Sequence, residues 1–361
     1  MSKARWTGAL LAATLLLTGT GAGAATAEGT GSSTGTAIGW RALGLAVSPE
    51  GAKAYVVAAD RSGRRTPVVL RTVDTRTGAV VAELPLAEDG TAGTPVVSRD
   101  GRRLHLLVAE QLVTVDTAAN AVVSRTPAPE QERPAGWSGG RLTGLAVSPD
   151  GSRVLVGQDG PALDGQGVRP GRVLVFDTRS GAFVGSVALR GHTVDALALQ
   201  AGGAAGYVST DLGVEHLDTT TAVPTVVRTV GRLGATKELA ASPDGLRVFA
   251  LGALADTGTG YVIDTGSDTA RPVFTFANGP LDLHYVAVNP DGGRLHVLKD
   301  GWTPQASVLS YDAVTGAGLP GETLTGFGLD GVSATAIAPG GHTLYVAGIR
   351  GEGSYLKGVA F

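Results

Sequence analysis

The chain has 361 residues, of which 43% are hydrophobic, and its 29 basic and 32 acidic residues give a formal net charge of −3. This balance, without a basic stripe, argues against nucleic acid as a partner. The complete absence of cysteine excludes a disulfide framework, thiolate metal sites and covalently attached haem.

The N-terminus has the three parts of a secretory signal peptide, at residues 1–27. Lys3 and Arg5 precede an apolar run at residues 8–17, and small residues follow up to Ala27. We expect cleavage near Ala27 and a secreted, extracellular protein. The apolar run is about half of the roughly 20 residues that a membrane helix needs, so we expect no stable membrane insertion, with an uncleaved anchor as the alternative. Residues 28–37 are small and polar and predict a flexible lead-in.

From residue 38 to residue 361, one short motif returns at a nearly constant interval. Its clearest copies read LAVSPEG at 45–51, LAVSPDG at 145–151, LAASPDG at 239–245 and VAVNPDG at 286–292, and weaker copies stand at 96–101, 197–203 and 336–341. Successive copies are 42 to 52 residues apart. Such self-similarity predicts one supersecondary unit used seven times in a single repeat domain.

The first unit shows how each repeat is built. A strand at 43–47 leads into a tight turn, in which Pro49 fixes φ near −65° and Gly51 closes the turn. A second strand, a polar loop and a third strand follow, and a second tight turn with the sequence DTRTG at 74–78 precedes the fourth strand. Four short antiparallel strands per repeat predict an all-β fold, a seven-bladed β-propeller of four-stranded antiparallel blades.

The last repeat is one strand short before the chain stops. We expect residues 37–40, which precede the first unit, to supply its missing outer strand and so close the ring without a free edge. The alternative is that this segment is disordered.

The repeats resemble a known group of propellers. The Ser-Pro-Asp-Gly turn, the pairs Tyr55-Val56 and Tyr345-Val346, and the apolar-Asp-Thr strand endings are similar to the YVTN-repeat and WD40-like families and to the lactonase-type propeller superfamily. Unit four is closest to the WD40 form, with Gly-His-Thr at 191–193 and Leu217-Asp218 where that family often has Trp-Asp. The resemblance implies a propeller and a structural hydrogen bond from His192 within its own blade. No unit has the family's Trp.

Alternating strand direction predicts that the two kinds of tight turn share one face of the disc, here called the turn face. The second-to-third-strand loops and the loops between units share the opposite one, the loop face. We expect the long insertions on the loop face and, with them, the binding surface; these are residues 127–140, 157–171, 300–305 and 316–331.

The position six residues before the turn Pro is expected at the mouth of the central channel. It is occupied in turn by Leu43, Gly93, Thr143, Asp195, Lys237, His284 and Ser333. Asp195, Lys237 and His284, with Asp282 nearby, are the candidates for acid–base catalysis, and a solvated rim of ion pairs is the alternative. The candidate binding residues are Trp40, Arg41, Trp137, Arg141, His192, Glu238, Trp302 and Asp330. Each Trp has the alternative role of filling a gap between blades.

Motifs for other chemistry are missing from the sequence. It has no Gly-x-Ser-x-Gly elbow, no His-Glu-x-x-His helix and no phosphate-binding loop, and Asp159 and Asp164 lack the spacing of a calcium loop. We therefore predict no cofactor and no metal. The leading hypothesis is a secreted, monomeric, non-catalytic propeller that binds a protein, peptide or polysaccharide outside the cytoplasm. The alternatives are a lactonase-like hydrolase or lyase that uses the channel-mouth residues, and a redox partner resembling quinoprotein propellers.

Overall fold

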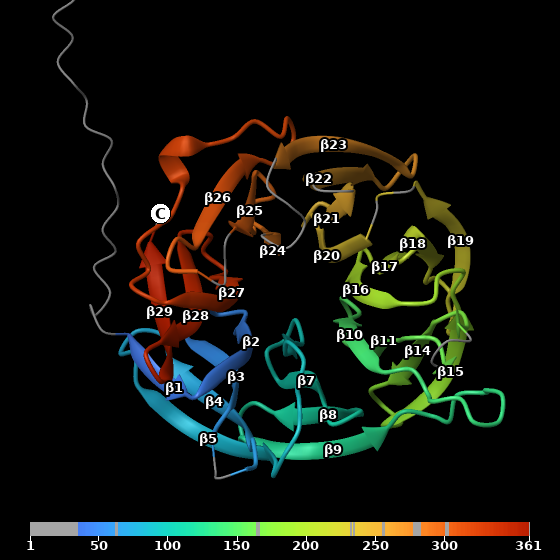
Figure 1. Cartoon of the computed structure of the whole chain (residues 1–361), viewed down its shortest axis with the longest axis horizontal. Helices are drawn as coiled ribbons and strands as arrows, with labels where there is room; N and C mark the ends of the chain where they lie inside the picture. Colours follow the sequence, from blue (N-terminus) through green and yellow to red (C-terminus); the bar gives the residue numbers. More distant parts are fainter. Residues whose placement is uncertain are drawn as a thin grey trace, which may run out of the picture.

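The computed structural model describes residues 35–61, 64–163, 167–231, 233, 235–254, 257–276, 283–299 and 303–360. The proposed signal peptide and residues 28–34 lie outside the described residues. Seven antiparallel sheets stand radially around a central channel, as the sequence predicts (Figure 1). No helix in the described part has the length and apolar character needed to cross a bilayer.

The strands of each blade follow one another outward from the channel. Blades one to three contain β2 (Arg41–Val47), β3 (Lys53–Ala59), β4 (Val68–Asp74) and β5 (Val80–Ala87); β6 (Val96–Val97), β7 (Arg103–Val108), β8 (Gln111–Asp116) and β9 (Ala121–Pro127); β10 (Leu142–Val147), β11 (Arg153–Gln158), β14 (Arg172–Asp177) and β15 (Ala182–Ala188). Blades four and five contain β16 (Val194–Leu199), β17 (Ala205–Thr210), β18 (Gly213–Asp218) and β19 (Thr225–Val230); β20 (Ala235–Ala241), β21 (Arg247–Leu254), β22 (Thr257–Asp264) and β23 (Thr269–Phe276). Blades six and seven contain β24 (Leu283–Val288), β25 (Arg294–Lys299) and β26 (Ser307–Asp312); β27 (Gly331–Ile337), β28 (Thr343–Arg350), β29 (Gly353–Ala360) and β1 (Thr36–Gly39).

The Ser-Pro-Asp-Gly motif forms the turn between the first two strands of a blade. In blade three, the Ser148 hydroxyl donates to Asp150 Oδ1 at 2.6 Å and accepts the Arg153 N–H at 2.9 Å, while Gly151 has φ +71°. Ser98 and Ser242 make the same pair of contacts in their blades. The motif is therefore a self-contained turn, in which only glycine adopts the positive φ without strain.

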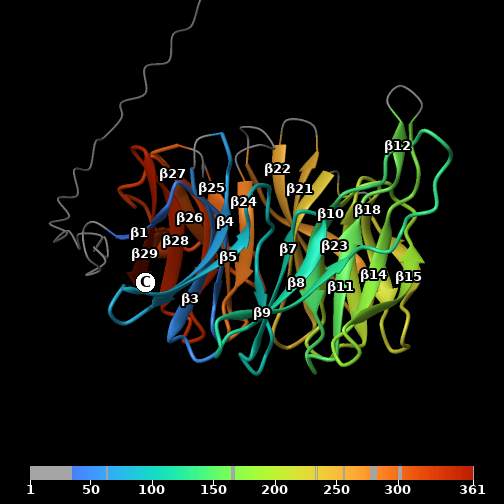
Figure 2. The same ribbon diagram turned by 90° about the horizontal axis from the view of Figure 1, so that it is seen from below.

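The Asp-Thr motif forms the second turn and ties it to the first. Asp74 Oδ1 accepts the Thr77 N–H at 2.7 Å, and the Thr75 hydroxyl donates to the carbonyl of Gly51 at 2.6 Å. Equivalent hydroxyl bonds join Thr117 to Gly101, Thr178 to Gly151, Thr219 to Gly203 and Thr265 to Gly245. The two turns thus lie together on one face, as predicted. Figure 2 shows the hairpin of β12 (Ala162–Leu163) and β13 (Gly167–Val168) projecting on the opposite side.

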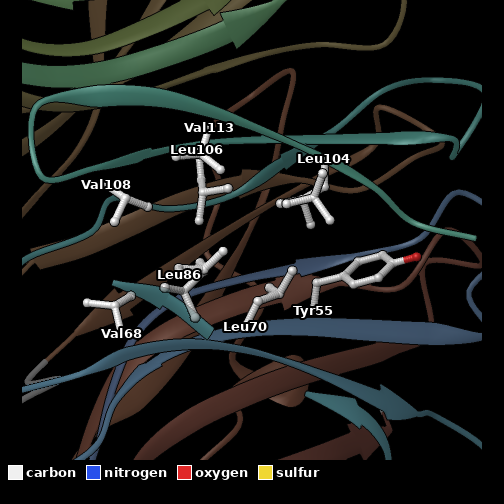
Figure 3. Close-up of a cluster of buried hydrophobic side chains, with 10 residues drawn as sticks. Tyr55, Val68, Leu70, Leu86, Leu104, Leu106, Val108 and Val113 are labelled. Carbon is white, nitrogen blue, oxygen red and sulfur yellow. The ribbon is translucent and has the colours of Figure 1, made fainter. Parts of the chain in front are cut away.

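The hydrophobic core lies between neighbouring blades. Between blades one and two, Tyr55 and Leu70 pack against Leu104 and Leu106, and all four are at most 2% exposed (Figure 3). Each fully buried Leu side chain contributes roughly 1.5–3 kcal/mol. Because every blade covers its neighbours in this way, stability comes from the ring rather than from a separate blade.

The N-terminal segment closes the ring, as expected. β1 pairs antiparallel with β29 of blade seven, with Thr36 opposite Leu356, and Ile38 is fully buried. The last sheet is therefore built from both ends of the described chain.

Blade six departs from the predicted pattern. Its sheet has three strands in the described part, and the segment after its second turn follows its outer edge, where Val308 and Leu324 exchange two backbone hydrogen bonds of 2.9 Å. Residues 316–331 are thus not a simple loop-face insertion. The short helix η1 (Pro320–Glu322) interrupts the pairing, since proline cannot donate to a strand ladder.

Candidate functional site

The channel mouth is shaped by an irregularity in the innermost strands. In six blades the register shifts, between Ala42 and Gly44, Leu142 and Leu145, Val194 and Leu197, Thr236 and Glu238, His284 and Val286, and Val332 and Ala334. The position six residues before the turn Pro lies at or beside this β-bulge. A bulge breaks the strict alternation of side chains, so simple alternation does not predict which side chains meet there.

Two carboxyl groups from neighbouring blades interact at the channel mouth. Asp195 lies in β16 and Glu238 in β20. Burial, together with the negative charge of Asp195, raises the pKa of Glu238 from 4.5 to about 7. A carboxyl group with a pKa near neutrality can exchange a proton at physiological pH, which is a requirement of general acid–base catalysis.

A third carboxyl group, which the sequence reasoning did not select, extends the cluster. Asp159 follows β11, and its Oδ1 accepts the N–H of Val194 at 2.8 Å. Burial raises the pKa of Asp159, this hydrogen bond opposes the change, and the charge of Asp195 adds to it. Glu110 makes the equivalent link one blade earlier, accepting the Leu142 N–H at 2.7 Å. Asp159 and Glu110 both follow the second strand of their blades, and this shared position is the sequence signal that could have identified them.

Tyr285 is a further residue that the sequence reasoning missed. It occupies the bulge of β24 with φ +54°, and its hydroxyl donates to the carbonyl of Ser333 in blade seven. Burial and the charge of Glu238 raise the pKa of Tyr285, while the charge of Arg41 lowers it. Arg41, a predicted binding residue, therefore lies close enough to Tyr285 for its charge to act on the hydroxyl.

We expect Glu238 to make folding stability depend on pH. The pKa of Glu238 is higher in the folded than in the unfolded protein, so the protonated carboxyl group favours the folded state. This stabilisation is fully present below about pH 4.5 and is lost as the pH rises through about 7. Glu238→Gln removes the titration, and the variant should gain stability relative to wild type between pH 5 and pH 8. Urea unfolding of the variant and the wild type at pH 5 and at pH 8 measures the difference in their free energies of unfolding. Glu352→Gln, at an exposed position, is the control. An equal pH dependence in Glu238→Gln and wild type would contradict the buried-carboxyl assignment.

Several predicted site residues cannot be joined to this cluster. Lys237 and His284 lie in β20 and β24, the expected innermost strands, but their side chains lie outside the described part. Asp282 and Trp302 lie outside the described residues altogether. The described centre of the site is therefore Asp195, Glu238 and Tyr285.

His192 makes the contact that the WD40 resemblance implies. Its Nδ1 lies 2.8 Å from Asp211 Oδ2, and its backbone N–H donates to Asp211 Oδ1 at 2.6 Å. Both residues belong to blade four, so the pair fixes the approach to β16. Two other predicted residues accept hydrogen bonds from backbone N–H groups: the Arg141 carbonyl accepts the Asp159 N–H at 2.9 Å, and the side-chain Oδ2 of Asp330 accepts the Gly351 N–H at 2.7 Å.

Three aromatic rings on the loop face, in the part of the chain that the structure describes, are paired with an arginine. The guanidinium carbon of Arg61 lies 5.7 Å from the ring centroid of Trp40, and that of Arg169 lies 5.4 Å from Trp137. A third pair, Arg350 over Tyr355 at 4.1 Å, was not predicted. The two tryptophan pairs come from second-to-third-strand loops and from connections before the first strand of a blade, whereas Arg350 ends β28 and Tyr355 lies near the start of β29, on either side of the turn between these strands. The loop face thus presents combined aromatic and cationic surfaces.

No group of three or more His, Asp or Glu side chains in the described part is arranged to hold a metal ion.

Comparisons with known proteins identify the fold. No family model matches the sequence, and no curated protein is significantly similar to it. Among solved structures, the chain is similar to hydrazine synthase from Kuenenia stuttgartiensis, with a TM-score of 0.68 and 16% identity over 89% of this chain and 96% of that chain. Because 1463 solved chains match in all, the likeness shows a widespread propeller fold and selects no function. The resemblance to YVTN-repeat and WD40-like propellers rests on the repeat motifs.

Proposed function

We propose that this protein is a secreted, non-catalytic propeller whose loop face binds a protein, peptide or polysaccharide outside the cytoplasm. The observation that carries the proposal is the set of three aromatic–arginine pairs on that face. Aromatic rings supply flat apolar contact area with little loss of side-chain freedom, and guanidinium groups add directed hydrogen bonds. Export rests on the N-terminal signal pattern.

Two of these pairs are neighbours at the junction of blades seven and one. The Ser354 hydroxyl donates to the Trp40 carbonyl at 3.0 Å and accepts the Ala42 N–H at 3.2 Å, which places Trp40 beside the start of β29 and therefore near Tyr355. Trp40 is 38% exposed. The third pair, Trp137 with Arg169, lies across the disc beside the β12–β13 hairpin, to which Ser138 is bridged at Ala162. An extended ligand could contact both places.

A capture experiment tests the proposal. Immobilised protein is incubated with culture supernatant and with cell-wall material, and retained components are identified before and after protease or glycosidase treatment. We expect one component to be retained, and the double substitution Trp40→Ala, Trp137→Ala to weaken its binding by about tenfold or more.

The matched control is Leu246→Ala, which removes a 61% exposed hydrophobic side chain from the turn face. It should leave binding unchanged. If no component is retained, or if retention survives the double substitution, the loop face is not the binding surface.

A second function is favoured by the carboxyl pair at the channel mouth. Asp195 and Glu238 could act as base and acid in a lactonase-like hydrolase or lyase, because their shared environment raises the pKa of Glu238 to about 7. Hydrolysis of a panel of small lactones tests this function. Asp195→Asn and Glu238→Gln should each reduce turnover by about 100-fold or more. Turnover equal to that of wild type would exclude this site.

A further inference from the structure

A cleft of about 700 Å³ opens on the turn face, between blades two and three. This is the side of the disc opposite to the proposed binding face. Its walls come from both tight turns of blade three and from the first turn of blade two, and it extends outward to Val123 and Ser124 of β9. The volume lies within the roughly 300–1,000 Å³ of small-molecule sites.

The cleft exists because a contact that the other blades make is missing here. A methyl group placed on the turn glycine of a blade would meet the preceding blade's turn, as at Gly101, 3.4 Å from Pro49, and Gly203, 3.2 Å from Pro149. Equivalent contacts join Gly245 to Gln200, Gly292 to Pro243, Gly341 to Asn289 and Gly51 to Pro339. Gly151 of blade three has no neighbour within 4 Å, and blade two carries Arg99 at the proline position.

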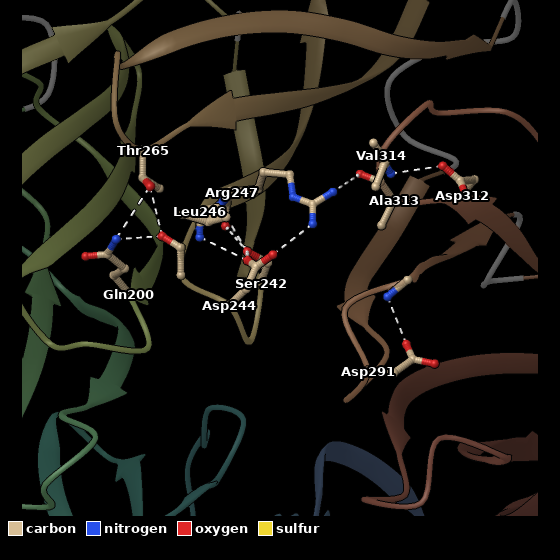
Figure 4. Close-up of polar contacts among 12 residues, drawn as sticks. Gln200, Ser242, Asp244, Leu246, Arg247, Thr265, Asp291, Asp312, Ala313 and Val314 are labelled. Atoms are coloured by element: carbon tan, nitrogen blue, oxygen red, sulfur yellow. Dashed lines mark hydrogen bonds and ion pairs between the residues drawn. The ribbon is translucent and has the colours of Figure 1, made fainter.

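A second contact between blades is also missing at this seam. Arg153 at the start of β11 donates to the carbonyls of Thr219 and Thr221 in the next blade, at 2.8 and 2.6 Å. Figure 4 shows Arg247 reaching Ala313 of blade six in the same way, at 3.1 Å. Arg103, the equivalent residue of blade two, instead forms an ion pair with Asp116 of its own blade. The second turn of blade three is left uncovered.

Two guanidinium groups face this opening from opposite sides. Arg99 comes from blade two and Arg179 from blade three, both are exposed, and neither forms an ion pair or side-chain hydrogen bond with another described residue. The carboxylates of the cleft, Asp100 and Asp150, accept hydrogen bonds inside their own turns. The cleft therefore has two guanidinium groups available to a ligand, whereas its two carboxylates, although negatively charged, are held by hydrogen bonds inside their own turns.

The exposed apolar surface that the cleft offers to the uncharged part of a ligand comes from Val123, which is 55% exposed, whereas Phe176 and His105 form the floor behind it and are each 2% exposed. His105 Nδ1 lies 3.1 Å from the Thr114 hydroxyl, and burial together with the charge of Arg103 lowers the pKa of His105 to about 4. The ring is neutral at pH 7, so it adds no charge to the cleft.

We propose that this cleft binds a small organic anion, with its carboxylate or phosphate group held between Arg99 and Arg179 and its remainder against Val123. Arginine suits both kinds of group because its planar donors match two anionic oxygens at once. The site is independent of the proposed loop-face function, since it is formed on the other face by different blades.

Calorimetric titration of the full chain with citrate, succinate and glucose 6-phosphate tests the proposal. We expect saturable binding of at least one of these anions with a Kd of about 1 mM or tighter. Arg99→Ala and Arg179→Ala should each weaken it by about tenfold, because each removes a charge-assisted contact. The control is Arg76→Ala, at the same place in the second turn of blade one, which should bind as wild type does.

Arg99→Pro separates ligand binding from folding. Proline occupies this position in five other blades, at residues 49, 149, 243, 290 and 339, and should restore the contact with Gly151. We expect a variant with an equal or higher Tm that no longer binds the anion. The proposal is overturned if none of the three anions binds saturably, or if binding persists undiminished in Arg99→Ala and Arg179→Ala.

Discussion

Replacing Asp268 with alanine is expected to lower the free energy of unfolding by about 1–3 kcal/mol, because it leaves the buried Tyr207 hydroxyl without its acceptor. The Asp268 side chain is only 4% exposed. Its Oδ2 lies 2.8 Å from His216 Nδ1 and 3.0 Å from Arg228 Nε, and its Oδ1 accepts the Tyr207 hydroxyl at 3.0 Å. Asp268 belongs to blade five and its three partners to blade four, so the cluster joins two blades.

The cluster also holds the rings of the neighbouring blade. Tyr207 is fully buried, and its ring stacks on His216 with centroids 5.0 Å apart and planes inclined by 10°. Without Asp268, the buried Tyr207 hydroxyl has lost its hydrogen-bond acceptor, and solvent has little access to replace it. An unsatisfied buried donor costs about 1–3 kcal/mol.

Urea denaturation of Asp268→Ala and Asp268→Asn measures these contributions separately. Asp268 has φ +52°, and asparagine tolerates this backbone conformation, so Asp268→Asn removes the charge with little backbone strain. We expect its loss of stability to be smaller than that of Asp268→Ala. If the alanine variant loses less than about 1 kcal/mol, the cluster does not stabilise the junction of blades four and five.

Truncating Ile38 to alanine should cost about 2–5 kcal/mol, as other large-to-small changes in protein cores do. Ile38 is the fully buried residue of β1, and it packs with Val56, Ala347 and Leu356 of blades one and seven. The cavity would lie at the seam where the ring closes. Arg71 also supports this strand, since its Nη1 donates to the Ile38 carbonyl at 2.8 Å.

Thermal and chemical unfolding of Ile38→Ala, with Val81→Ala as control, checks this expectation. Val81 lies on the outer strand β5 and is 56% exposed, so its truncation should change stability by no more than about 0.5 kcal/mol. Similar small losses in both variants would show that closure through β1 contributes little to stability.

The fold could be predicted because its determinants are local. Ser148, Asp150 and Gly151 complete their turn among themselves, and Thr178 joins the second turn to Gly151. The residues that determine the two turns of a repeat therefore lie within that repeat. The missing strand of the last repeat led to the prediction that residues 37–40 close the ring, and the closing strand β1 lies at residues 36–39. Blade six was less predictable, because the pairing of Leu324 with Val308 depends on tertiary contacts that leave no periodic pattern.

The candidate site could be predicted only in part. The expected channel position did locate Asp195 and, one residue from Lys237, Glu238. It missed Tyr285, because the bulge in β24 shifts the register by one residue and no turn residue marks it. It also missed the cleft between blades two and three, since substitution of proline by Arg99 looks like ordinary variation until the contacts of the other blades are compared.

The pairing of Thr36 with Leu356 has a consequence for how the molecule is made. A nascent chain that has emerged only as far as blade six holds one half of this seam without its counterpart, and bringing such distant segments together is intrinsically slow. Until β29 is available, β1 is a strand without a pairing partner and could associate with another copy of the chain. Maturation should therefore have a late step, in which the two halves of the final blade meet.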